Sequence, residues 1–372
     1  MSKDIRPFTI DIPQAAVDEL RDRLARTRWA ADELPGAGWR YGVPTAALKA
    51  LASYWAGDYD WRAQEARMNA YPQYVTEIDG VDLHFLHVRS PRQDAFPLIL
   101  THGWPGTFLE YLPVIDALSE SFHLVIPSLP GFGFSGPTRE SGWDVRRTAQ
   151  AWVTLMDRLG YERYGAAGSD GGSMISPVMG ALAPSAVAAV HVAQVFSYPS
   201  GDPAEFEGFG PEEYRRLAFM QRFVDEHSGF NKIQSTRPST LAHALVDSPV
   251  GQLAWVLDPL RGFGDHPAEM EKDLDFDFIL TVASLFWFSG NVGSSSRMHY
   301  EDAHRSIEDT PRGTVPTGVV VFANDFLSIR AFAERDHNIV HWSEFDRGGH
   351  FSGTDATDLV VEDLREFFAA YR

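Results

Sequence analysis

The chain contains no cysteine among its 372 residues. This absence excludes a disulfide framework, a thiolate nucleophile and a cysteine-ligated metal, and it predicts a reducing, cytoplasmic location. Basic residues are also scarce, because 32 Lys and Arg oppose 51 Asp and Glu and leave a net charge of −19. No block of Lys or Arg interrupts this acidic balance. The composition therefore argues against nucleic acid and anionic membranes as partners.

Long apolar runs, cofactor motifs and metal motifs are missing as well. The longest apolar stretch, residues 276–290, contains Asp277 and is too short to span a bilayer. Residues 1–7 have no apolar signal core. No Gly-rich phosphate loop opens a helix after a strand, and no His-Glu-x-x-His pair occurs. We therefore expect a soluble protein with no cofactor and no metal. The sequence is compatible with a homodimer.

Hydrophobic residues make up 44% of the chain, which is enough for a large core. Helical spacing of apolar residues comes first, and from about residue 73 it gives way to alternation around Asp79-Gly80, which predicts a hairpin. Short apolar runs then alternate with helical stretches, which predicts buried parallel strands joined by helices. The expected helices are 12–30, 44–56, 108–119 and 143–159, and the expected strands are 74–78, 81–88, 96–100 and 123–127.

The second half of the chain interrupts this series and then resumes it. A strand is expected at 187–196, strands return at 317–322 and 338–342, and a final helix covers 357–371. The mostly helical stretch between them predicts a lid over the carboxyl ends of the core strands. We expect an N-terminal extension with helices and a hairpin over residues 1–90. A first core part should cover 91–197, a helical lid 198–310, and a second core part 311–372.

Residues 168–172 fit a pattern of small residue, any residue, nucleophile, any residue, small residue, with Asp170 at the centre. Small residues two positions either side of a nucleophile allow the sharp turn between a strand and a helix that exposes its side chain. An aspartate there would attack carbon and form an ester, which water then hydrolyses. The register shifted by one residue makes Ser169 the nucleophile, so a serine esterase is a rival hypothesis.

Three other segments complete a candidate site. Residues 101–106 follow an apolar strand, where the backbone N–H of Trp104, with that of Gly171, would bind an oxyanion. His350 lies on a Gly-rich loop after the last strand, the usual place of the base. Asp325 lies just past the strand before it and would orient the imidazole. Nucleophile, acid and base in this order are more specific than any one of them.

These segments resemble the α/β-hydrolase-fold epoxide hydrolases. The resemblance rests on residues 102–105, 129–135, the Asp170 elbow and 348–351, and the segments 23–29, 39–43, 59–62 and 247–251 narrow it to the microsomal and juvenile-hormone type. It covers nearly the whole chain. It implies an α/β fold with a mostly parallel sheet, a small hydrophobic epoxide as substrate and a vicinal diol as product. It also implies that Asp170 opens the epoxide, that His350 activates water with Asp325 as its acid, and that lid tyrosines donate hydrogen bonds to the epoxide oxygen.

The chain departs from the family pattern near the expected lid tyrosines. The first tyrosine is replaced by Phe230, and the second corresponds to Tyr300, with His299 there if the register shifts by one residue. Gly171 stands where a tryptophan is common. We expect Tyr300 as the main donor, with Phe230, Trp104 and His299 lining the substrate pocket. Besides the serine esterase, two hypotheses remain: a binding protein of this fold that has lost turnover, and a haloalkane dehalogenase.

Overall fold

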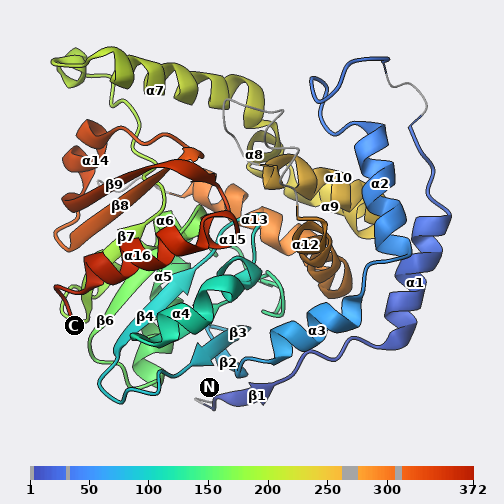
Figure 1. Cartoon of the computed structure of the whole chain (residues 1–372), viewed down its shortest axis with the longest axis horizontal. Helices are drawn as coiled ribbons and strands as arrows, with labels where there is room; N and C mark the ends of the chain where they lie inside the picture. Colours follow the sequence, from blue (N-terminus) through green and yellow to red (C-terminus); the bar gives the residue numbers. More distant parts are fainter. Residues whose placement is uncertain (1–3, 31–33, 262–274, 306–311) are drawn as a thin grey trace.

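A single mixed sheet forms the centre of the computed structural model, which describes residues 4–30, 34–261, 275–305 and 312–372 (Figure 1). The strand order is β1-β2-β3-β5-β4-β6-β7-β8-β9. The first three pairings, up to β3 with β5, are antiparallel, and all later ones are parallel. The strands are β1 Arg6–Phe8, β2 Gln73–Ile78, β3 Val81–Val88, β4 Phe96–Thr101, β5 Phe122–Pro127, β6 Tyr164–Gly168, β7 Val187–Val192, β8 Pro316–Asn324 and β9 Asn338–Gly349.

The central strands are mostly apolar because both faces of the sheet are covered. In β4, Leu98, Ile99 and Leu100 are at most 1% exposed, as expected for parallel strands between layers of helices. The β2–β3 hairpin turns at Asp79 and Gly80, whose φ angles of 52° and 78° are the positive values that a two-residue hairpin turn needs. The mostly parallel sheet predicted from the sequence is therefore confirmed.

Helices of the core and of the N-terminal extension follow the predicted pattern with several differences. The expected helix 108–119 is divided into a 3₁₀ turn and a short α-helix, because Pro113 lies in the segment and has no N–H to donate. The helices α3, α14 and α15 and the strand β1 were not predicted, and the helix expected over 12–30 ends at Ala25. The helices are α1 Gln14–Ala25, α2 Thr45–Ala56, α3 Trp61–Asn69, η1 Phe108–Val114, α4 Ile115–Ser119, α5 Val145–Arg158, α6 Gly171–Leu182, α14 Arg330–Asp336, α15 Ser352–Asp355 and α16 Thr357–Phe368.

The inserted segment is helical and packs against the extension. Figure 1 shows α10 and α12 beside α2. Trp55 Nε1 donates a buried hydrogen bond of 3.0 Å to Ser284 Oγ, and the hydroxyls of Tyr59 and Thr281 lie 2.9 Å apart. The elements of this insertion are η2 Pro203–Phe206, α7 Pro211–Arg222, η3 Phe223–His227, α8 Gly229–Gln234, α9 Pro238–Asp247, α10 Pro249–Leu260, α12 Phe276–Ser289 and α13 Val292–His304.

Among the described helices, none is by itself long and apolar enough to cross a bilayer. The helices α12 and α13, bent by 95° at their junction, meet the length and composition criteria only as a pair.

Candidate active site

Asp170 occupies a strained turn between β6 and α6. Its φ and ψ are 50° and −117°, a region that non-glycine residues rarely adopt and that costs about 1–3 kcal/mol. The flanking glycines make the turn possible. A Cβ at Gly168 would lie 2.5 Å from the carbonyl carbon of Gly172, and one at Gly172 would lie 1.8 Å from the Thr101 oxygen. The turn leaves the Asp170 side chain 28% exposed.

His350 and Asp325 converge on this carboxylate from the ends of β9 and β8. His350 Nδ1 lies 2.8 Å from Asp325 Oδ1, and Nε2 lies 3.7 Å from Asp170 Oδ2. Both side chains are buried, with 4% and 1% exposed. Burial alone would lower the pKa of His350, but the charge of Asp325, its hydrogen bond to the ring and the nearby charge of Asp170 raise it to about 9. The predicted nucleophile, base and acid are thus brought together.

The loop after β4 holds one oxygen of the nucleophile. The Trp104 backbone N–H donates a 2.8 Å hydrogen bond to Asp170 Oδ1, and the Trp104–Pro105 peptide is cis. The loop approaches so closely that a Cβ at Gly103 would lie 1.9 Å from Asp170 Oδ1 and 2.4 Å from the Gly171 nitrogen. Because Gly171 begins α6, its N–H lies at the positive end of that helix. A Cβ at Gly171 would touch Met298 Cε at 3.4 Å, so Met298 fills the space beside the nucleophile.

Ser169, the rival nucleophile, faces a different environment. Its Oγ donates to Glu110 Oε1 at 2.5 Å and lies 3.1 Å from the Tyr111 hydroxyl. It lines a cavity of about 30 Å³ together with Leu100 and other core residues. Burial raises the pKa of Glu110 to about 8, so this carboxyl is protonated at neutral pH. The geometry favours Asp170, the more exposed of the two neighbours, as the nucleophile.

Gln194, which the sequence did not single out, joins the nucleophile to the acid. Its Oε1 accepts a 2.7 Å hydrogen bond from the Asp170 backbone N–H and one of 3.2 Å from Ser173 Oγ. Its Nε2 donates to Asp325 Oδ2, and the residue is fully buried. The only signal in the sequence is a polar residue at the end of the expected strand 187–196. In the structure β7 already ends at Val192, so Gln194 lies at the carboxyl edge of the sheet.

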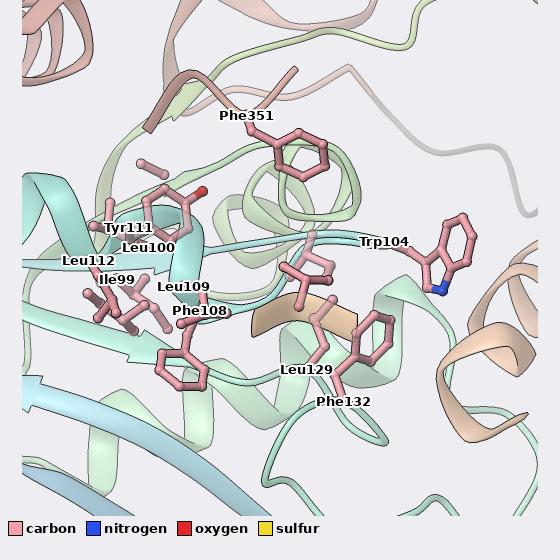
Figure 2. Close-up of a cluster of buried hydrophobic side chains, with 14 of the residues drawn as sticks. Ile99, Leu100, Trp104, Phe108, Leu109, Tyr111, Leu112, Leu129, Phe132 and Phe351 are labelled. Carbon is pink, nitrogen blue, oxygen red and sulfur yellow. The ribbon is translucent and has the colours of Figure 1, made fainter. Parts of the chain in front are cut away.

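On the lid side of the site, two aromatic rings lie against Trp104. The Phe230 ring stacks on Trp104 with centroids 5.1 Å apart, and the His299 ring meets Trp104 edge-on at 5.6 Å. Tyr300 instead stacks on His304 at 4.0 Å. One residue along an α-helix turns the side chain by about 100°, so the register that brings His299 to Trp104 turns Tyr300 aside. In Figure 2, Trp104 lies apart from the side chains packed around Leu112.

Among the described residues, no cluster of three or more His, Asp or Glu side chains has the arrangement of a metal site. Three features define the chain as an α/β-hydrolase: the sheet, the strained turn after β6, and the loop after β4 that binds Asp170 Oδ1. The turn carries a carboxylate at the position of the nucleophile. Matches to known families agree with this class. The pattern of the alpha/beta hydrolase fold matches residues 97–235, and that of the Epoxide hydrolase N terminus matches residues 5–111.

Individual relatives show which group of α/β-hydrolases this chain resembles. A protein of Stigmatella aurantiaca provisionally named an epoxide hydrolase is 39% identical over 99% of this chain and 86% of its own length. Epoxide hydrolase 1 of Sus scrofa is 29% identical over 98% and 88%. The chain belongs to the epoxide hydrolase family, and it is an enzyme that converts an epoxide and water to a diol.

Solved structures of epoxide hydrolases superpose on nearly the whole chain. The juvenile hormone epoxide hydrolase of Bombyx mori superposes with a TM-score of 0.92 at 27% identity, covering 100% of this chain and 95% of that one. The Aspergillus niger epoxide hydrolase has a TM-score of 0.87 at 30% identity, covering 99% and 96%. These matches include the helical insertion as well as the core.

Proposed function

We propose that the enzyme opens a small hydrophobic epoxide by covalent catalysis at Asp170. The observation that carries this proposal is the division of labour between the two carboxylate oxygens. Oδ1 is held by the Trp104 N–H at 2.8 Å, whereas Oδ2 is the oxygen 3.7 Å from His350 Nε2. In the first step Oδ2 attacks an epoxide carbon, the ring carbon–oxygen bond breaks, and an ester and an alkoxide form.

Formation of the ester prepares His350 for the second step. The Asp170 charge contributes to the raised pKa of His350, and esterification removes that charge. The pKa of His350 therefore falls in the intermediate, and more of the imidazole becomes the neutral base. Nε2 then takes a proton from water, and the hydroxide attacks the Asp170 carboxyl carbon. The Trp104 and Gly171 N–H groups stabilise the tetrahedral oxyanion, and Asp325 stabilises the imidazolium. The intermediate then collapses: the bond between the Asp170 carboxyl carbon and the diol oxygen breaks, the diol takes the proton of the new carboxyl group, and the Asp170 carboxylate is restored.

Exchange of the nucleophile tests the proposal. Asp170→Asn should abolish turnover, and Ser169→Ala should retain most of it, because only the carboxylate can form the ester. A single turnover in ¹⁸O-water should place the label first in the Asp170 carboxylate. Label that enters the diol directly would refute the covalent route, and loss of activity in Ser169→Ala with retention in Asp170→Asn would favour the esterase-like register.

The proposal also covers the domain division, the wall of the substrate pocket and the location of the enzyme. The division into extension, first core part, lid and second core part at 1–90, 91–197, 198–310 and 311–372 is supported by the change from strands to helices after β7. The stacked pair of Trp104 and Phe230 offers an apolar wall to the substrate. Lack of cysteine supports a cytoplasmic location.

A further inference from the structure

Ring opening needs a hydrogen-bond donor on the lid side of the site. The alkoxide that leaves is strongly basic, and a preorganised donor stabilises the charge as it develops. Phe230 has no donor, and the Tyr300 ring is engaged with His304. His299 packs against both Trp104 and Phe230, with ring centroids 5.6 and 6.1 Å apart. It also lies close enough to Asp170 for that charge to act on its pKa.

The hydrogen bonds behind His299 determine which of its ring nitrogens carries the hydrogen. Trp255 Nε1 can only donate, and it lies 2.9 Å from one amide atom of Gln234, which must therefore be the oxygen. Ser296 Oγ also donates to that oxygen at 3.1 Å. The other amide atom, Gln234 Nε2, can only donate and lies 3.2 Å from His299 Nδ1. His299 Nδ1 is consequently the acceptor, and the hydrogen of the neutral ring is on Nε2.

The remaining nitrogen is available for a ligand. In the part of the chain that the structure describes, no side chain bonds to His299 Nε2, whereas Gln234 behind the ring is fully buried. Burial lowers the pKa of His299 to about 4 against the opposing effects of the Asp170 charge and of a hydrogen bond with the Ser296 backbone, so at neutral pH the ring has one hydrogen. Trp104 Nε1, in the same ring cluster, is a buried N–H without a partner in the described residues. Both observations fit a pocket completed by a hydrogen-bond acceptor.

We propose that His299 is the lid donor of this enzyme, a catalytic residue that donates an Nε2–H hydrogen bond to the epoxide oxygen, and that Trp255 and Gln234 fix the tautomer this requires. The inference rests on the covalent mechanism proposed above. Asp170 Oδ2 forms the carbon–oxygen bond as the ring bond breaks, and the hydrogen bond from His299 stabilises the alkoxide. The alkoxide takes its proton from water, and the hydroxide released is neutralised by the proton that His350 later removes from the hydrolytic water.

The test isolates ring opening in a His350→Gln background, where the ester accumulates. Styrene oxide is the probe, and adduct formation is followed by intact-protein mass in quenched samples. His299→Phe keeps an aromatic ring against Trp104 but removes the donor, and we expect roughly a hundredfold slower alkylation. Tyr300→Phe, one residue along the same helix, is the matched control and should alkylate at the parent rate.

Gln234→Glu tests the tautomer without removing the imidazole. A carboxylate behind the ring accepts from Nδ1, so the neutral ring presents a bare Nε2 to the epoxide and alkylation slows at high pH. Toward low pH the imidazolium carries hydrogen on both nitrogens, and the rate should recover. The parent should show no such dependence near neutral pH. This profile also decides the question if His299→Phe fails to fold.

The outcomes separate the two proposals. If the His350→Gln parent forms no adduct on Asp170, the covalent mechanism is wrong and the role of His299 falls with it. If the parent forms the adduct and His299→Phe forms it at the same rate, only the inference is overturned. Slower alkylation in Tyr300→Phe would assign the donor to Tyr300 and also overturn the inference. If the alkylation rate of Gln234→Glu depended on pH as the parent's does, Gln234 would not fix the tautomer of His299.

Discussion

Gln194→Met is the substitution that best tests how the nucleophile and the acid are coupled. Methionine has a similar length but provides neither hydrogen bond. The change leaves the Asp170 backbone N–H without its 2.7 Å acceptor and removes the donor to Asp325 Oδ2. Both groups lie at the buried end of the site, where water cannot easily replace the lost partner.

The size of the effect follows from those two bonds. An unsatisfied buried N–H costs about 1–3 kcal/mol, and a hydrogen bond to a charged group contributes about 1.5–3 kcal/mol. We expect the free energy of unfolding to fall by about 2.5–6 kcal/mol. Without its second donor, the Asp325 carboxylate attracts a proton on His350 more strongly. The pKa of His350 should therefore rise, by at most about one to two pH units, the equivalent of the lost bond.

The assay is the hydrolysis of the preformed ester in single turnovers across pH. Hydrolysis needs the neutral imidazole, so its rate rises as pH passes through the pKa of His350 in the ester form. In Gln194→Met this limb should move to higher pH. A general loss of packing would lower the rate at every pH but would not move the limb.

Gln252→Met provides the matched control. Gln252 is equally buried and donates 2.8 Å from Nε2 to the Ala283 carbonyl in the lid, away from the three catalytic groups. Its loss should cost about 1–3 kcal/mol of stability and leave the pH profile in place. Superimposable profiles for Gln194→Met and the wild type would show that the buried amide is structural and would refute the coupling.

Four further substitutions address the rest of the site. Gly103→Ala should greatly slow both half-reactions, because its Cβ would lie 1.9 Å from Asp170 Oδ1; a variant with wild-type kinetics would contradict the described loop geometry. His350→Gln should accumulate an adduct of one substrate per chain, visible by intact mass, whereas Asp325→Asn should slow hydrolysis less completely; full multiple turnover by His350→Gln would remove the base from the mechanism. Glu110→Gln should flatten the pH dependence of stability. Burial raises the pKa of Glu110 from 4.5 to about 8, so the unfolded chain releases this proton first and the wild type loses stability between those pH values. Thermal melts should show the variant gaining on the wild type from about pH 5 to about pH 8, and a constant difference would show that Glu110 is ionised in the folded protein.

Local patterns account for the parts of the fold and site that the sequence predicts. The strand β4, the hairpin at Asp79 and Gly80, and the elbow at Asp170 are each specified by residues within a few positions of one another. The order of Asp170, Asp325 and His350 along the chain was sufficient to place them together, because parallel strands end at one edge of the sheet.

The parts that were missed depend on contacts between distant segments. The strand β1 has three residues and exists because it pairs with β2, almost seventy positions later. Gln194 gains its meaning only when β7 brings it between Asp170 and Asp325. The choice between His299 and Tyr300 is a rotation of one helix, which is set by how α13 packs on α8 and α9. None of these relations leaves a periodic signal in the sequence.

The bonds between the extension and the lid have a consequence for recombining this enzyme with its relatives. Tyr54, Trp55 and Tyr59 bond to Asp277, Ser284 and Thr281, and Arg23 donates to the Asp247 carbonyl at 2.8 Å. Residues from the first sixty positions thus hold helices that follow them by some 220 positions. In a chimaera in which only the lid is replaced by that of a relative, these hydroxyls and the indole N–H would lose their hydrogen-bond partners. The unit of exchange is therefore the lid together with α1 and α2, although the gene encodes them far apart.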